Sequence, residues 1–315
     1  MYVPLCEITI GKYIFRHVVN VKIESSRKDM GDTAVIVLPS KYAGKSLAKE
    51  IKEGDRVEIR LSYDGYGMNT EFTGYVNIIG CNLPVEIQCE DEIYKLKRTP
   101  AKVKSWQSTK LKDVLHHLVP DATLEVPDIT LSPFYIKGTL NVATALQQIR
   151  DAYGLDVYFR GSKLFAGLAY TEKSMSAAKP VVFDLRKNVV KNDIEFVRAD
   201  SRRIKLKAIS MLPGNKQLKY ETGDPDGEVR TLHFYNKTTS ELKALADEEV
   251  KKFKSDGFKG HFTCFGIPFV QHGMIAEIRE EGFEEKNGKY FVDKVTTEYG
   301  MNGFRREIEP GRKAS

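Results

Sequence analysis

The feature that most constrains the fold of this chain is a short pattern that occurs twice, once near each end. Residues 54–60 read GDRVEIR and residues 273–279 read GMIAEIR. After a turn-rich gap, each is followed by a strand-like segment that contains an aromatic residue, at 72–76 and at 290–295. Internal similarity is the sequence signature of a repeated architecture, although a glycine before a strand is also ordinary turn chemistry. We therefore expect two similar β units, one towards each end.

The first hundred residues have the pattern of β-strands. Apolar residues alternate at 5–10, 19–23, 35–37, 54–61, 71–76 and 85–89. This period of two gives a strand one buried and one solvated face. A short helical piece is expected around 46–51. The basic stretch 95–104, which surrounds Pro100, marks the expected boundary with the next domain.

The middle of the chain predicts a small α/β domain. Apolar residues at 111, 114, 115 and 118 fall on one helix face, with Ser108 as the expected N-cap and Pro120 beyond the end. A second helix is expected before Gly154, which can end it in a left-handed conformation, and Asn141 can cap its start. Segments 155–159 and 164–166 then predict a hairpin.

Strand patterns return from residue 181, at 194–196, 204–208, 218–220 and 229–234, and again from 263 to 295. One helix interrupts them. Thr238 and Glu241 have the spacing of a capping box, and Gly257 is the expected end of that helix. The sequence thus predicts a mainly β (α+β) chain with three domains, at 1–100, 101–180 and 181–315.

Composition is that of an ordinary folded protein. With 315 residues, 41% hydrophobic and 29% charged, two or three domains with filled cores are expected. The start lacks a basic segment followed by an apolar one, and no apolar run approaches the ~18 residues of a membrane helix, so we expect a protein made and kept in the cytoplasm. The net charge of +6 would suit a phosphate-bearing partner but is also common among proteins that bind none. The four cysteines have no CxxC spacing, and we expect reduced, packed thiols.

A search for chemistry leaves no catalytic, cofactor or metal residue to propose. Gly44-Lys45-Ser46 resembles the end of a phosphate loop, but the required glycine is replaced by Pro39, so we expect a helix N-terminus without ligand. The histidines lack liganding partners at helical spacing; they are His17, His116, His117, His233, His261 and His272. Residues 224–227 (DPDG) lack the third oxygen ligand of a calcium loop.

Two charged features suggest alternative functions. The acidic clusters at 90–92, 280–281 and 284–285 could supply a glycosidase pair, although acidic residues beside turns are usually solvated. Residues 202–207 (RRIKLK) give one strand a positive face for DNA or an acidic neighbouring subunit. A lysine-guarded edge or outer barrel face is favoured there, because no aromatic residue is interleaved for base stacking.

Three segments together resemble the phage late control protein D family of tail hubs, which is related to the hub region of type VI secretion spike proteins. They are 54–60 followed by 72–76, 140–154 running into 155–159, and 288–292 with 299–306. The resemblance implies two β-barrel hub domains joined by the α/β insert, with three chains forming a pseudo-sixfold ring.

The function that this resemblance implies is structural. We expect a non-enzymatic baseplate hub of a phage or prophage tail, a homotrimer that joins the tail tube protein to the spike protein and touches other baseplate proteins. It would meet DNA only in transit, would not insert in a membrane, and would be assembled in the bacterial cytoplasm into the virion tail. Since the chain stops at Ser315 without a spike or lysozyme extension, we expect the adaptor alone. A cell-wall hydrolase and, behind it, a nucleic-acid-binding module are the competing hypotheses.

Overall fold

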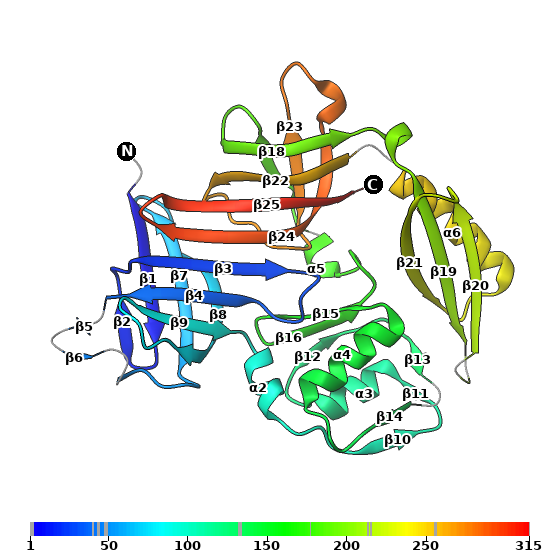
Figure 1. The fold of residues 1–315 in the computed structure, drawn as a ribbon, viewed down its shortest axis with the longest axis horizontal. Coiled ribbons are helices and arrows are strands. Elements are labelled where there is room, and N and C mark those ends of the chain that lie inside the picture. The colour runs from blue at the N-terminus through cyan, green and yellow to red at the C-terminus, as the bar shows by residue number, and fades with distance from the viewer. Residues whose placement is uncertain are drawn as a thin grey trace.

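The computed structural model describes residues 3–39, 41–42, 45–46, 50–131, 134–176, 178–212, 214, 216–254 and 257–314 (Figure 1). Most of the strands gather into one 13-stranded sheet, with several smaller sheets beside it. The predicted fold class is confirmed: two β units flank a small α/β part.

The first β unit wraps seven strands around its own core. They are β1 (Pro4–Ile10), β2 (Tyr13–Phe15), β3 (Asn20–Ser26), β4 (Thr33–Leu38), β7 (Arg56–Tyr63), β8 (Asn69–Ile79) and β9 (Val85–Glu90). Neighbours follow the order β3-β4-β9-β8-β7-β1-β2. The predicted alternation holds in β7, where Val57, Ile59 and Leu61 are fully buried. Burial of these side chains supplies the main stabilising term.

A short strand pair, β5 (Lys41–Tyr42) with β6 (Lys45–Ser46), lies between β4 and β7. The helical piece predicted around 46–51 is therefore wrong at its start, since Ser46 belongs to a strand; residues 47–49 lie outside the described part of the chain. The same strand overturns the expectation that Gly44-Lys45-Ser46 forms a helix N-terminus, while Gly44 itself is not among the described residues.

The second β unit has six strands around a separate core of Phe183, Phe262 and Tyr290. They are β17 (Val181–Asp184), β18 (Val189–Val197), β22 (Gly257–Phe265), β23 (Ile275–Arg279), β24 (Gly288–Gly300) and β25 (Gly303–Lys313). Neighbours follow the order β18-β22-β25-β24-β23-β17. Five of these strands match β3, β4, β9, β8 and β7 of the first unit in the same spatial order and in the same order along the chain.

The repeated sequence pattern is confirmed at the level of the backbone. Gly54 and Gly273 have φ of 85° and 84°, a conformation that favours glycine. The Gly54 N–H donates to the carbonyl of Val76 at 2.8 Å, and the Gly273 N–H donates to the carbonyl of Val292 at 2.8 Å. The register then shifts between Val76 and Ile78 in one unit and between Val292 and Lys294 in the other, so both units carry a β-bulge at the same place.

The two units share one continuous sheet. β24 runs antiparallel to β3, with Lys294 opposite Ser26 and Tyr299 opposite Val21. Figure 1 shows the resulting layer, in which β18, β22, β25, β24, β3 and β4 lie one below another. No flexible connection separates the units at this point, because ladder hydrogen bonds cross the junction.

The insert between the units packs helices against a three-stranded sheet, β12-β16-β15. The first hundred residues end with α2 (Ile93–Arg98), which packs against the core of the insert. The elements of the insert itself are β10 (Lys104–Trp106), β11 (Thr109–Lys110), α3 (Leu111–Leu118), β12 (Thr123–Glu125), β13 (Thr130–Leu131), β14 (Phe134–Ile136), α4 (Val142–Tyr153), β15 (Asp156–Arg160), β16 (Lys163–Gly167) and α5 (Lys173–Ser176). The Asn141 cap and the left-handed Gly154 of α4 are confirmed. The Ser108 cap is wrong: α3 starts after Lys110, because Thr109 and Lys110 pair with β13 instead.

A second insertion interrupts the second unit between β18 and β22. After a short 3-10 turn, η1 (Ala199–Ser201), it forms the sheet β20-β19-β21, covered on one face by α6 (Thr239–Phe253). Its strands are β19 (Ile204–Leu212), β20 (Lys216–Gly223) and β21 (Glu228–Tyr235). The capping box of Thr238 and Glu241 is confirmed. The predicted end at Gly257 is wrong, because α6 stops at Phe253 and Gly257 begins β22.

Candidate functional site

Two carboxylates of the first predicted acidic cluster are held in ion pairs. Glu90 and Glu92 form ion pairs with Lys97 at 2.6 Å and Lys95 at 3.0 Å. Glu284 and Glu285 lie in a short 3-10 helix, η2 (Glu284–Lys286). In the part of the chain that the structure describes, no group of three or more His, Cys, Asp or Glu side chains could hold a metal ion.

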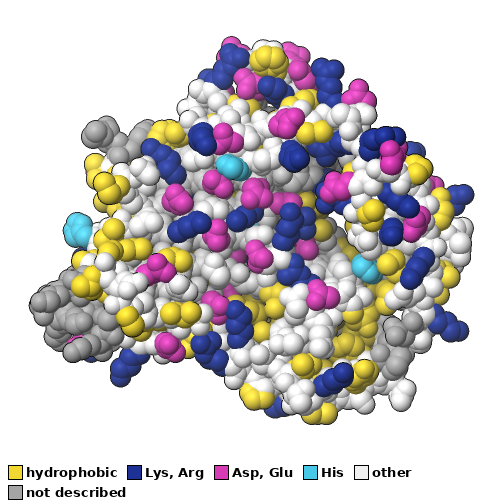
Figure 2. Space-filling model, viewed as in Figure 1, with side chains coloured by type: hydrophobic (Ala, Val, Ile, Leu, Met, Phe, Trp, Pro, Cys, Tyr) yellow, Lys and Arg dark blue, Asp and Glu magenta, His cyan; other side chains and the backbone are white. Residues whose placement is uncertain are grey.

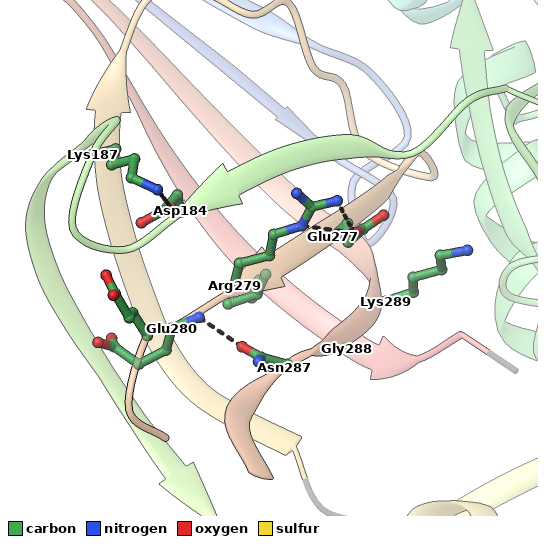
Figure 3. Close-up of a pocket in the computed structure, with 10 residues that line it drawn as sticks. Asp184, Lys187, Glu277, Arg279, Glu280, Asn287, Gly288 and Lys289 are labelled. Carbon is green, nitrogen blue, oxygen red and sulfur yellow. Dashed lines mark hydrogen bonds and ion pairs between the residues drawn. The ribbon is translucent and has the colours of Figure 1, made fainter. Parts of the chain in front are cut away.

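A solvent-open cavity of about 580 Å³ lies between β17, β23 and the start of β24. Several of its charged groups form ion pairs (Figure 3): Lys187 contacts Asp184 at 2.9 Å, and Arg279 contacts Glu277 at 2.6 Å. Glu280 pairs with Arg186 at 2.8 Å, and its backbone N–H donates to the side-chain oxygen of Asn287. Contacts within the chain thus engage Asp184, Glu277 and Glu280.

The basic strand at 202–207 has a different setting from the one predicted. β19 is the central strand of its sheet, so the interpretation as a lysine-guarded edge is wrong. Ile204 and Leu206 are buried on one side, while Lys205 and Lys207 contact Glu221 of β20 at 2.9 and 3.6 Å. Its positive face is thereby partly neutralised inside the chain.

The exposed face of the shared sheet carries charges of both signs, visible as intermixed dark blue and magenta side chains across the centre of Figure 2. Glu24 on β3 contacts Lys22 of the same strand at 3.2 Å and Lys294 of β24, across the junction, at 3.5 Å. His261 on β22 lies 3.5 Å from Glu307 on β25. Such exposed pairs add little stability, but they keep this broad face polar.

The most elaborate polar site lies where the two β units meet the insert. Arg27, in the turn between β3 and β4, donates to Asp293 at 2.8 Å and to Asp156 at 3.0 Å. Tyr170 donates to the same Asp293 at 2.6 Å. These residues come from the first unit, the second unit and the insert, so a single guanidinium ties three parts of the chain together through charge-assisted bonds.

A second network lies next to it and is centred on Arg160 of β15. Arg160 contacts Glu172 at 3.1 Å and donates to the backbone carbonyl of His272 at 2.8 Å. Tyr158 donates to Glu172 at 2.8 Å and packs edge-on against the fully buried His272 ring, 4.6 Å away. Burial and the neighbouring arginines hold the pKa of His272 well below its usual range, so this imidazole is neutral at neutral pH.

Two carboxylates of the first unit border this network. The backbone N–H of Asp32 donates to Asp91 at 2.9 Å, and Ser25 donates to Asp32 at 2.9 Å. Asp32 lies 3.9 Å from the His272 ring nitrogen. Burial raises the pKa of Asp32 to about 6, and burial together with the charge of Asp32 raises the pKa of Asp91 well above its usual range. Both line a cavity of about 270 Å³ between the three parts.

A third contact joins the β units directly. Arg306 of β25 makes two bonds to the carboxylate of Glu71 on β8, at 2.6 and 2.7 Å, and donates to the Gly266 carbonyl at 2.7 Å. The side chains of Arg306 and Glu71 are 1% and 2% exposed. Sequence reasoning missed all three networks, because their partners lie up to 266 residues apart and leave no local spacing to detect.

Comparison with known proteins matches the whole arrangement. The tail protein from Neisseria meningitidis MC58 superimposes with a TM-score of 0.67 and 17% identity, covering 100% of this chain and 97% of that chain. The 43 kDa tail protein of prophage MuSo2 from Shewanella oneidensis gives 0.63 and 16% identity, with 98% of each chain covered. This is the fold of phage tail proteins. The resemblance to the tail-hub family is therefore confirmed at the level of the fold.

The tail-protein fold extends to secretion systems. A component of the type VI secretion system of E. coli, described as structurally similar to T4 bacteriophage tail proteins, gives a TM-score of 0.61 at 9% identity, covering 98% of this chain and 77% of that chain. No protein-family model and no curated protein matches the sequence. Among the described residues, no helix has both the length and the apolar character needed to cross a membrane.

Proposed function

We propose that this chain is a structural subunit of a phage-type tail, a baseplate hub that assembles as a homotrimer and joins the tail tube to the central spike. One observation carries the proposal: the match to tail proteins runs through both β units and the insert of this chain and through nearly all of the other chain. Fold alone does not fix function, and the extent of the match along this chain supports a role of the same kind.

The duplicated β unit gives the proposal a physical rationale. Three copies of a chain with two similar units present six similar surfaces, so the ring can meet a sixfold tube on one side and a threefold spike on the other. The buried networks of Arg27, Arg160 and Arg306 suit such a part, because they hold the two units and the insert in one fixed relation. We propose the same three domains, 1–100, 101–180 and 181–315, and assembly in the bacterial cytoplasm into the virion tail.

The competing hypotheses find less support. A cell-wall hydrolase needs a pair of carboxylates facing a substrate groove, whereas the predicted acidic clusters supply Glu90, Glu92 and Glu280 to ion pairs. A nucleic-acid-binding module needs free positive charge, whereas Glu221 partly neutralises Lys205 and Lys207 of the basic strand. We therefore expect no soluble fragments when the protein is incubated with peptidoglycan, and DNA contact only in transit.

Native mass spectrometry of the purified protein at micromolar concentration tests the proposal. A trimer that also retains the tail tube and spike proteins encoded beside its gene is the expected result. A persistent monomer that captures neither partner would contradict it. Release of peptidoglycan fragments would favour the hydrolase instead, and DNA binding that weakens steeply with salt would favour the nucleic-acid-binding module.

A further inference from the structure

The junction between the two β units can be repeated between chains. Inside one chain, β3 of the first unit pairs with β24 of the second. The equivalent of β24 in the first unit is β8, and the equivalent of β3 in the second unit is β18. Strand β18 lies at the end of the sheet, where β22 is its only strand neighbour in the described part of the chain (Figure 1, uppermost strand of the layer).

The second open edge lies at the end of β8. Strand β7 pairs with β8 only from Asn69 to Tyr75, and the last contact on that side is the bond pair between Val76 and residues 54–55. No strand in the described part of the chain pairs with residues 77–79 on this side, at the position where β24 continues into its contact with β3. Ile78 is 48% exposed there, an apolar side chain on an unpaired strand edge, which is a typical site for strand addition.

We propose that β18 of one copy pairs antiparallel with the end of β8 in the next copy, and that this contact closes the ring. The proposal rests on the proposed function, because it specifies how the copies of the hub meet. The shared bulge fixes the equivalence, since Ile78 corresponds to Lys294 and Ile79 to Val295. The pairings of β3 and β18 with β4 and β22 make Ser26 equivalent to Val197 and Ser25 equivalent to Phe196.

The register of the contact follows from these equivalences. Lys294 faces Ser26 inside the chain and Val295 faces Ser25, so Ile78 should face Val197 of the neighbour, and Ile79 should face Phe196. The contact is heterologous, since different edges meet, and such contacts form either rings or open filaments. β8 ends at Ile79 whereas β24 reaches Gly300, so the contact between chains is shorter than the junction within a chain.

Charge exchange across the predicted pair gives the main test. Ile78→Lys or Val197→Asp alone should weaken trimer formation about tenfold or more, because each places a charge opposite an apolar side chain. The double variant Ile78→Lys/Val197→Asp should restore the trimer, because the new charges face each other. Val229→Asp is the matched control: Val229 is 53% exposed on the edge strand β21 of the other sheet and should leave assembly unchanged. Circular dichroism and melting temperature establish that each variant is folded.

Cysteine crosslinking supplies an independent readout. In a Cys81→Ser background, oxidised Ile78→Cys/Val197→Cys should run as dimer and closed trimer on a non-reducing gel, whereas Ile78→Cys/Val229→Cys should remain monomeric. If the wild type forms trimers while the crosslink fails and both single charge variants still assemble, the strand contact is overturned and the hub function stands. If the wild type forms no oligomer, both fall.

Discussion

The two β units share five strands in one order, yet they differ in what is added to that shared set. In the first unit, β1 lies between β2 and β7 and is antiparallel to both. β2 therefore runs parallel to β7 but does not pair with it directly. In the second unit, β17 pairs in parallel with β23 directly, so β1 has no counterpart. The turn between β3 and β4 spans residues 27–32, whereas the equivalent connection between β18 and β22 holds a whole sheet and α6. The two units therefore have the same five strands and differ in the added strands and in the segments that connect them.

The difference extends to the polar networks. The short turn of the first unit contributes Arg27 and Asp32 to the three-way junction. The long connection of the second unit instead reaches the insert through apolar contacts, where Met211, Ile209 and Tyr235 pack against the insert core. Charged groups thus take part in the contact of the first unit with the insert, whereas the second insertion meets the insert mainly by apolar burial. This difference predicts different responses to substitution and pH.

Removal of the Arg306 guanidinium should cause the largest loss of stability, because Arg306 and Glu71 form the buried ion pair that connects the two units. Arg306→Ala leaves the Glu71 carboxylate buried without its partner, which typically costs about 3–5 kcal/mol. Urea denaturation should show this loss as a lower midpoint. The double variant Arg306→Met/Glu71→Met should recover part of the stability, and a double variant less stable than Arg306→Ala would contradict this account.

Matched truncations in the two cores should cost nearly the same. Ile59 of β7 and Ile278 of β23 occupy equivalent positions and are both fully buried. Ile→Ala at either site should lower the free energy of unfolding by about 3 kcal/mol. If the units unfold together, both variants should shift one transition by equal amounts in fluorescence and circular dichroism. Two separate transitions, each moved by only one variant, would show that the units unfold independently.

Alanine at the two matched glycines tests the shared backbone. Gly54→Ala and Gly273→Ala each force a Cβ into a left-handed conformation and should cost about 1–2 kcal/mol. A Cβ on Gly54 would lie 3.2 Å from the Tyr94 hydroxyl, whereas one on Gly273 would meet its nearest atom, in Met175, at 3.4 Å. Gly54→Ala should therefore be slightly the more harmful. Thermal melts measure the difference, and a stabilising effect at either site would refute the proposed equivalence.

The smallest expected effect depends on pH and belongs to the first unit alone. Because the pKa of Asp32 is raised to about 6 from an ordinary value of 3.8, the folded protein binds this proton more tightly than the unfolded chain does. Its contribution to stability is therefore present below pH 4 and is lost as pH rises through 6. Asp32→Asn should gain about 1 kcal/mol relative to the wild type between pH 4.5 and 5.5. Denaturation curves at both values measure this gain, and the exposed Asp64→Asn serves as the control.

Local rules predicted much of this fold from the sequence. The alternation of Val57 and Ile59 gave a strand because one face of β7 is buried, and the caps at Asn141 and Thr238 were found because capping depends on neighbours within three residues. Ser108 and Gly257 failed as helix signals for the opposite reason: Thr109 and Lys110 pair with Leu131 and Thr130, which lie 22 and 20 residues further along the chain, and Gly257 enters a sheet. Tertiary pairing overrides local preference in such places.

The candidate site could not be predicted in the same way. The partners of Arg27 lie 129 and 266 residues away, and a surface arginine has the same local sequence context as one that ties three segments together. The position of β19 at the centre of its sheet could not be predicted either. A strand with alternating lysines can lie at an edge or at the centre of a sheet, because an acidic residue on a neighbouring strand can match its charge.

The length of β24 has a mechanical consequence. Its 13 residues span on the order of 40 Å at the usual rise of a strand, and its two ends serve different units, the first end pairing with β23 and the second with β3. A force applied to one unit would act along the axis of β24. The hydrogen bonds between β24 and β3 would share this force and transmit it to the other unit. The chain should therefore behave as a stiff beam, yielding at its insertions before it yields between its halves.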